Sequence, residues 1–273
     1  MSGQPDSPVY ICARMLSRLR PYRVHLALAI YTPLLLFADS RTATLLQQYL
    51  LGAVTFLVLF LVLRLSPPAE RRQVWLCVGV ATCFEVLGSL VLGLYTYRFH
   101  NVPLFVPPGH GLVYYFGLTG ARTPLMRRHG RTIAMVVLGL AGGWALAGLT
   151  LLPFITHRID VLGASCIPIL AWFLLRSPRG TVFAGIFFAT TGLELFGTNF
   201  GNWMWQPYGP LFPHLPAGNP PSAIAGGYCV IDGSVAIVSM GIARAVTAAR
   251  ALVRLTDAPA ELPLRPLPEP EQA

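Results

Sequence analysis

Long apolar stretches recur along nearly the whole chain, and most of them are close to 20 residues long. A helix of about that length crosses the hydrocarbon core of a bilayer, so the pattern predicts an all-α integral membrane protein. The eight expected spans cover residues 22–38, 43–64, 73–95, 104–121, 131–154, 159–176, 180–199 and 221–248. The fourth is short, and we expect Pro107, Pro108 and Gly109 to break or kink it.

The spans fall into two halves. Adding 109 to a residue number carries the second and third spans approximately onto the sixth and seventh. We therefore expect two four-helix repeats, 22–121 and 131–248, joined by a cytoplasmic linker, 122–130. An even number of spans in each half makes the repeats parallel rather than inverted. A basic arm, 1–21, precedes them, and a disordered Pro-rich tail, 249–273, follows them.

Composition and charge agree with this class of protein. The chain is 54% hydrophobic and 11% charged, whereas a soluble domain has about 25% charged residues. Every basic residue is arginine, and the eight-span arrangement puts 17 of the 20 on one side. Only Arg41, Arg98 and Arg158 fall on the other side. The positive-inside rule therefore predicts cytoplasmic termini in a multi-pass protein of the bacterial cell (inner) membrane.

The net charge of +9 is thus mainly an insertion signal. No basic stripe with interleaved aromatic residues lies outside the spans, so a nucleic-acid partner is not expected. The sequence also contains no Gly-rich phosphate loop, no Gly-x-Ser-x-Gly and no Cys/His nucleophile pair.

A motif with a glutamate inside a predicted span occurs once in each half. Its shared pattern is Glu, Gly three residues later, then Ser or Thr, then Gly-x-aromatic-x-aromatic, then Pro-x-Gly-His/Asn. The first copy contains Glu85, Gly88, Ser89, Gly93, Tyr95, Tyr97, Pro107 and His110. The second contains Glu194, Gly197, Thr198, Gly201, Trp203, Trp205, Pro216 and Asn219.

A charged residue costs a few kcal/mol within a membrane, so Glu85 and Glu194 are functional candidates. Their matching places predict one site at the seam of the two halves, near the outer leaflet. A carboxyl that stays protonated near neutral pH can act as a general acid, and its ionised counterpart as a base. The alternative is that each glutamate only joins two helices by a hydrogen bond. On a helix, Ser89 and Thr198 would share a face with the glutamates and bond to them.

The motif aromatics have two interpretations. Tyr95, Tyr97, Trp203 and Trp205 follow the spans closely, where aromatic residues commonly anchor a protein at the membrane interface. Their repeated spacing after a repeated glycine also predicts that they wall a substrate pocket. We therefore include them as candidate substrate-binding residues, together with Asn219.

Two other polar residues are candidates for the chemistry. His110 is suited to proton transfer, and we expect it within hydrogen-bond reach of Glu85 or of a bound water, at the same place on a broken helix as Asn219. The alternative is that His110 only caps that helix. Asp232 lies near the middle of the last span and has no counterpart in the first half; it is an ionic partner, a third carboxyl of the site or a member of a proton relay. Two glutamates and a histidine are potential metal ligands, but no tight ligand spacing such as HExxH is present. We expect neither a metal nor a cofactor.

The intramembrane Glu, the following Gly and the aromatic-x-aromatic pair resemble carotenoid-biosynthesis hydratases of the bisanhydrobacterioruberin hydratase type. The residues that carry the resemblance are Glu85, Gly88, Gly93, Tyr95, Tyr97 and Pro107, with Glu194, Gly197, Gly201, Trp203, Trp205 and Pro216. This similarity implies a polytopic enzyme that adds water to the end of a polyene. The chain departs from the pattern at His110 and in the segment 219–221, which leaves open a separate bacterial membrane family.

Two classes of function remain. One is a membrane hydratase that acts on an isoprenoid or another lipid partner entering from the bilayer, with the two glutamates as acid and base. The other is a proton-coupled transporter, or a protein that binds a small solute or a lipid at the repeat seam. A bound apolar lipid would favour the first class, and a bound polar solute or ion would favour the second.

Overall fold

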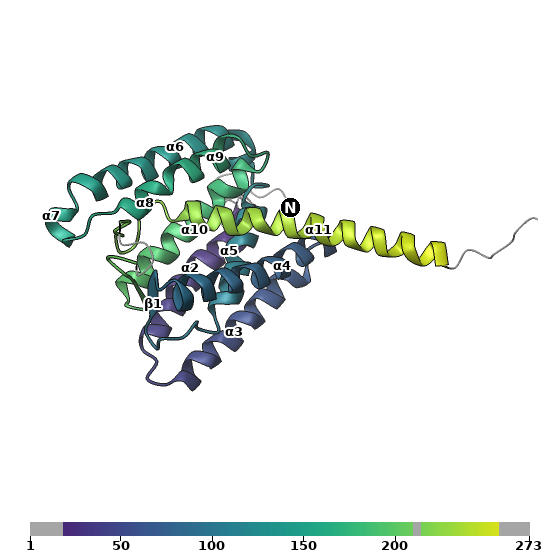
Figure 1. Cartoon of the computed structure of the whole chain (residues 1–273), viewed down its shortest axis with the longest axis horizontal. Helices are drawn as coiled ribbons and strands as arrows, with labels where there is room; N and C mark the ends of the chain where they lie inside the picture. The colour runs from purple at the N-terminus through teal and green to yellow at the C-terminus, as the bar shows by residue number, and fades with distance from the viewer. Residues whose placement is uncertain (1–18, 210–213, 257–273) are drawn as a thin grey trace, which may run out of the picture. The chain divides into compact units, whose positions relative to one another are not determined.

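The computed structural model describes residues 19–209 and 214–256, with side chains up to residue 250 (Figure 1). The described chain is almost entirely helical. In order, its elements are η1 (Arg20–Tyr22), α2 (Arg23–Ser40), α3 (Leu45–Arg64), α4 (Pro68–Glu85), η2 (Val86–Val91), β1 (Tyr95–Tyr97), α5 (Val106–Gly120), α6 (Pro124–Thr150), α7 (Pro153–Thr156), α8 (Val161–Ser165), α9 (Ile167–Leu175), α10 (Gly180–Asn199), β2 (Trp203–Trp205) and α11 (Ala225–Thr256). Most of the predicted N-terminal arm and C-terminal tail lies outside the described residues.

Six of the described helices are long and apolar enough to cross a membrane. They are Arg20–Ser40, Leu45–Arg64, Pro68–Val91, Pro124–Thr150, Gly180–Asn199 and Ala225–Arg250. The chain is therefore an all-α membrane protein, as its hydrophobic pattern predicts. The fourth and sixth predicted spans are also helical, but α5 has only 15 residues, and the apolar segment Val161–Leu175 is similarly short.

Several helices begin where the sequence supplies a suitable first turn. Thr44 accepts a hydrogen bond from the backbone of Gln47, whose side chain returns a bond to the backbone of Thr44, and this pair caps α3. Pro107 and Pro108 lie in the first turn of α5, where a missing N–H leaves no bond unmade. The expectation that these prolines break or kink the fourth span was therefore wrong.

The third predicted span does not run to residue 95 as a regular helix. Its α-helical part ends at Glu85, and the chain continues as the π-helix η2. Gly93 then adopts a positive φ of 59°, which a residue without a side chain tolerates. The turn leads into strand β1, whose antiparallel pairing with β2 the helical pattern did not predict.

Three other boundaries also differ from the prediction. The expected linker 122–130 is mostly the beginning of α6. The expected sixth span is divided at Cys166 into α8 and α9. The last helix begins at Ala225 rather than at residue 221 and continues to Thr256. This helix crosses the division between two compact units, residues 1–236 and 237–273, and the packing described below is that of the first unit.

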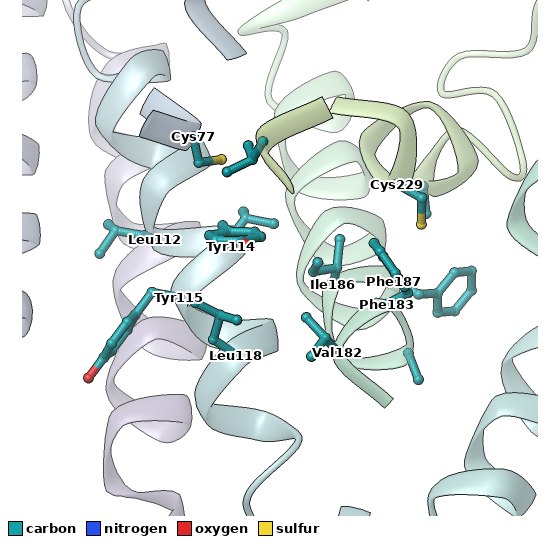
Figure 2. Packing of buried hydrophobic residues seen from close by; sticks show 14 of the residues in the cluster. Cys77, Leu112, Tyr114, Tyr115, Leu118, Val182, Phe183, Ile186, Phe187 and Cys229 are labelled. Carbon is teal, nitrogen blue, oxygen red and sulfur yellow. The ribbon is translucent and has the colours of Figure 1, made fainter. Parts of the chain in front are cut away.

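Helix α5 forms the centre of the first unit. It contacts α2, α3, α4 and α10, and Figure 2 shows its Tyr114 and Leu118 facing the core beside Ile186 of α10. Gly117 allows this approach, because a methyl group there would lie 2.6 Å from Ile186 Cγ1. Burial on all sides supplies the protein contacts that a short helix with an irregular start needs at membrane depth.

The starts of four long helices lie close to one another. Contacts join the N-terminal end of α6 to those of α2 and α10, and join the end of α5 to the start of α4. The contacts are Tyr22–Leu125, Gly130–Thr181 and Glu70–Arg122. The segments between these helices, which contain α3, α5 and α8–α9, therefore bring the chain back to this end before α4, α6 and α10 begin.

Candidate functional site

Glu85 and Glu194 line the same cavity. It has a volume of about 600 Å³ and is walled by residues of α2, α4, η2, β1, α5, α10, β2 and α11. Both glutamate side chains are buried. The four motif aromatics and His110 also line the cavity. The structure thus brings together seven of the residues that the sequence singled out.

The first motif copy surrounds Glu85 with hydrogen-bond partners. The hydroxyls of Tyr95 and Tyr97 donate to Glu85 Oε2 over 2.8 and 2.7 Å. His110 Nε2 lies 2.7 Å from the other oxygen, Oε1, so the predicted contact between His110 and Glu85 is confirmed. Burial, followed by the charge of Glu85, raises the pKa of Tyr97 well above its usual value. Tyr97 therefore keeps its proton and remains a donor to the carboxylate.

The second copy repeats this arrangement with different chemistry. The indole N–H groups of Trp203 and Trp205 both donate to Glu194 Oε2 over 3.0 Å. The hydroxyl of Tyr228 donates to Oε1 over 3.2 Å. An indole N–H is only a donor, so Oε2 must be an unprotonated acceptor. A proton on Glu194 is thereby confined to Oε1.

The motif glycines allow each aromatic pair to reach its glutamate. A methyl group on Gly88 would lie 3.1 Å from the Tyr95 hydroxyl oxygen, and one on Gly197 would overlap the Trp203 indole. Each of these glycines therefore admits an aromatic ring of its own motif. The second glycine of each copy turns the chain from helix to strand, with a positive φ at Gly201 as at Gly93.

The two short strands bring the motif copies into register. Tyr95 pairs with Trp205 and Tyr97 with Trp203, about the central pair Thr96 and Met204. The Tyr95 and Trp205 ring centroids lie 4.6 Å apart, and those of Tyr97 and Trp203 lie 5.9 Å apart. This antiparallel pairing relates the copies by a local two-fold axis and places all four aromatics against the cavity.

His110, which contacts Glu85, and Tyr228, which contacts Glu194, make the surroundings of the two glutamates different. Their rings stack with centroids 5.0 Å apart and an interplanar angle of 17°. His110 is the fifth residue of α5, but its counterpart Asn219 lies before α11, where its Oδ1 accepts from the Trp205 backbone N–H. The expectation that both residues occupy the same place on a broken helix was therefore wrong.

Four of the sequence candidates are absent from the cavity wall: Ser89, Thr198, Asn219 and Asp232. Thr198 donates to the backbone carbonyl of Glu194 and not to its carboxyl, because a hydroxyl at i+4 in a regular helix reaches that carbonyl first. The π-helix after Glu85 has a wider turn, so Ser89 does not keep the α-helical spacing from it.

Two of the three arginines that are exceptions to the predicted charge asymmetry, Arg98 and Arg158, hold connections between helices. Arg98 donates to the carbonyl oxygens of Asp39 and Thr42 over 2.6 Å each, at the end of α2. A cation is favourable at that end of a helix because the carbonyls there lack partners. Arg158 donates to the Trp205 carbonyl over 2.7 Å. Both residues therefore support the loops and strands around the cavity.

The apolar flank of the protein reaches the cavity. Four large apolar side chains that line it are also exposed to the surroundings, on η2, α10 and α11. They are Leu87, Phe188, Phe196 and Val230. In a membrane protein such side chains face lipid, so the cavity has a boundary with the bilayer.

Comparison of the chain with protein-family models, with curated proteins and with solved structures gave no match. The site's chemistry is therefore argued from its own geometry. No group of three or more His, Cys, Asp and Glu side chains in the described part of the chain has an arrangement suited to a metal ion.

Sequence reasoning missed two parts of the site. Nothing in the repeat marks Tyr228, because its counterpart by offset is Thr119. The buried Asp39 was also missed: its carboxylate accepts from Gln48 and from Asn202, which follows Gly201. A charged residue near the end of the first span was the available signal.

Proposed function

We propose that this protein is an enzyme that adds water across a carbon–carbon double bond of an isoprenoid or a similarly apolar lipid. The observation that carries the proposal is the pair of buried carboxyls with different partners in one largely apolar cavity. Glu85 is joined to His110 and two phenols. Glu194 has no basic partner among the described residues and receives only neutral donors.

This difference assigns the two roles. Glu194, protonated on Oε1, gives its proton to one carbon of the double bond, whose π electron pair forms the new C–H bond. A carbocation remains at the other carbon. The oxygen of a water molecule bonds to this carbon, and the Glu85–His110 pair takes the proton that the water loses. The product is an alcohol, and general acid and base groups of this kind typically contribute about 10²–10⁴-fold each.

The aromatic wall suits the charged intermediate. The faces of Tyr and Trp rings attract a cation within about 6 Å. Tyr95 and Trp205 pack at 4.6 Å on the cavity side of the strands, which gives the developing carbocation an apolar but electron-rich surface. The lipid-exposed lining side chains favour entry of the substrate from the bilayer rather than from water.

The topology that we propose has eight crossings in two parallel four-helix repeats, with both termini in the cytoplasm. The clustered starts of α2, α4, α6 and α10 support it, because the intervening segments must return through the same layer. The matching local structure of the two motif copies supports a common origin of the halves. The site then lies toward the outer leaflet, as the motif positions predict.

The test is water incorporation. The purified protein is incubated in detergent with a polyene that ends in a trisubstituted double bond, in water enriched in ¹⁸O, and mass spectrometry follows the product. We expect a product heavier by one labelled water, and a loss on the order of 100-fold or more in E194Q and in E85Q. Thr190→Val on the same helix as Glu194 is a control that should retain activity. Absence of labelled product from the wild type across chain lengths would refute the proposal.

A transporter remains the second candidate, because a buried Glu–His pair at a repeat seam is also suited to proton coupling. Mass spectrometry of molecules that co-purify separates the two. An apolar lipid in the cavity supports the enzyme, and a polar solute or ion supports the transporter.

A further inference from the structure

One buried carboxyl takes no part in this mechanism. Asp232 is 6% exposed and lies on α11 one helical turn from Tyr228. Its Oδ1 accepts from the Cys77 thiol over 3.5 Å, and its Oδ2 has no hydrogen-bond partner among the described residues. A carboxyl within a membrane span that lacks a cationic partner is costly, so its position calls for a function.

Asp232 lies one helical turn beyond the residues that contact the two glutamates. On α5, His110 and Tyr114 are one turn apart, as Tyr228 and Asp232 are on α11, and one turn is about 5.4 Å. His110 stacks on Tyr228, and Tyr228 lies one turn from Asp232 on α11. The Cys77 sulfur contacts Asp232 and also lies 3.9 Å from the His110 carbonyl oxygen.

An arginine lies beyond this group on the same side as the starts of the long helices. From His110, α5 runs through Tyr114 toward that end of the bundle. Arg179, which precedes α10, is 3.4 Å from the Tyr114 hydroxyl through its Nη1. Polar side chains are therefore present on the path from the cavity toward the end where the long helices begin.

We propose that Asp232 is a relay residue that exchanges protons between the Glu85–His110 pair and the inner aqueous side. A proton leaves the His110 imidazole, an O–H bond forms on Asp232, and the proton then passes to water at the inner side. This inference rests on the proposed function. Each hydration leaves one extra proton on the Glu85–His110 pair and removes one proton from Glu194. Water accepts the extra proton and returns a proton to Glu194, so the net charge of the site is restored.

The titratable groups that face Asp232 come from three elements. They are Cys77 of α4, His110 and Tyr114 of α5, and Cys229 of α11 itself. Of these, His110 alone exchanges a proton readily near neutral pH. Asp232 therefore exchanges protons with His110 and not with the other groups that face it.

A pH jump tests the relay without any substrate. Stopped-flow infrared spectroscopy follows the imidazole and carboxylate bands of His110 and Glu85 after the jump. We expect the response of D232N to be slower than that of the wild type by on the order of 100-fold, while C229A, a neighbouring substitution, keeps the wild-type rate. Elution as a single symmetrical peak shows that both variants are folded. An unchanged rate in D232N would overturn the relay.

Turnover measurements distinguish this inference from the proposed function. With the relay correct, D232N forms labelled product in the first turnover at the wild-type rate but turns over slowly afterwards. A slow first turnover would instead place Asp232 in the chemistry and overturn the relay. If the wild type forms no labelled product, the proposed function fails, and the pH-jump result still decides the role of Asp232.

Discussion

Substitution of Gly197 by alanine tests how the second glutamate is held. The added methyl group would overlap the Trp203 indole, so either the ring or α10 must move. Overpacking of this kind costs about 1–3 kcal/mol. Displacement of the indole also removes its N–H from Glu194 Oε2, and a hydrogen bond between neutral groups contributes about 0.5–1.5 kcal/mol. We therefore expect G197A to lose about 2–4 kcal/mol of stability.

The assay is thermal unfolding in detergent, followed by loss of the monodisperse peak in size-exclusion chromatography. Gly192 on the same helix provides the matched control, because a methyl group there meets no atom within 4 Å. G192A should be as stable as the wild type or up to about 1 kcal/mol more stable, since alanine favours helix over glycine. G197A should melt well below both and lose activity along with the bond to Trp203.

Equal melting of G197A and G192A would refute the reasoning. It would mean that the indole has room to turn aside without cost, and that the close glycine contact does not determine the position of Trp203. Retained activity in a destabilised G197A would refute only the link between the Trp203 bond and the chemistry.

Three further predictions follow from the site and the topology. H110N should fold but lose activity or shift its pH optimum; wild-type activity from pH 5 to 8, the range in which a free imidazole titrates, would show that His110 is only a cap. Because the folded-state pKa of Tyr97 is raised, its contribution to stability should be present below about pH 10 and decline as the pH rises further, a decline that Y97F should reduce in alkaline unfolding curves. A cysteine at residue 10 or 255 should react with an impermeant maleimide only after lysis, and labelling of either in intact cells would contradict cytoplasmic termini.

The sequence predicts the membrane class and the membership of the cavity because both depend on local pattern. Apolar length identifies the six long helices, and the duplicated spacing identifies Glu85, Glu194 and the four motif aromatics that line the cavity. Their positions do not require knowledge of tertiary contacts. An intramembrane carboxylate is also rare enough to be informative by itself.

The parts that sequence could not predict depend on contacts between distant segments. The strands β1 and β2 have three residues each, which is too short for a recognisable alternation of apolar and polar residues. Each forms only by pairing with the other. Tyr228 reaches Glu194 from 34 residues away, with no repeat to mark it.

The enclosure of α5 has a consequence for the order in which the protein is assembled. During synthesis, α5 leaves the ribosome about 60 residues before α10, which forms its largest contact. At 15 residues, it spans about 22 Å, less than the roughly 30 Å hydrocarbon core, and its first five residues include two prolines and a histidine. Stable packing of α5 therefore has to wait for α10, and β1 has to wait for β2. A chain truncated before residue 180 lacks both partners, so it should be a substrate for membrane quality-control proteases.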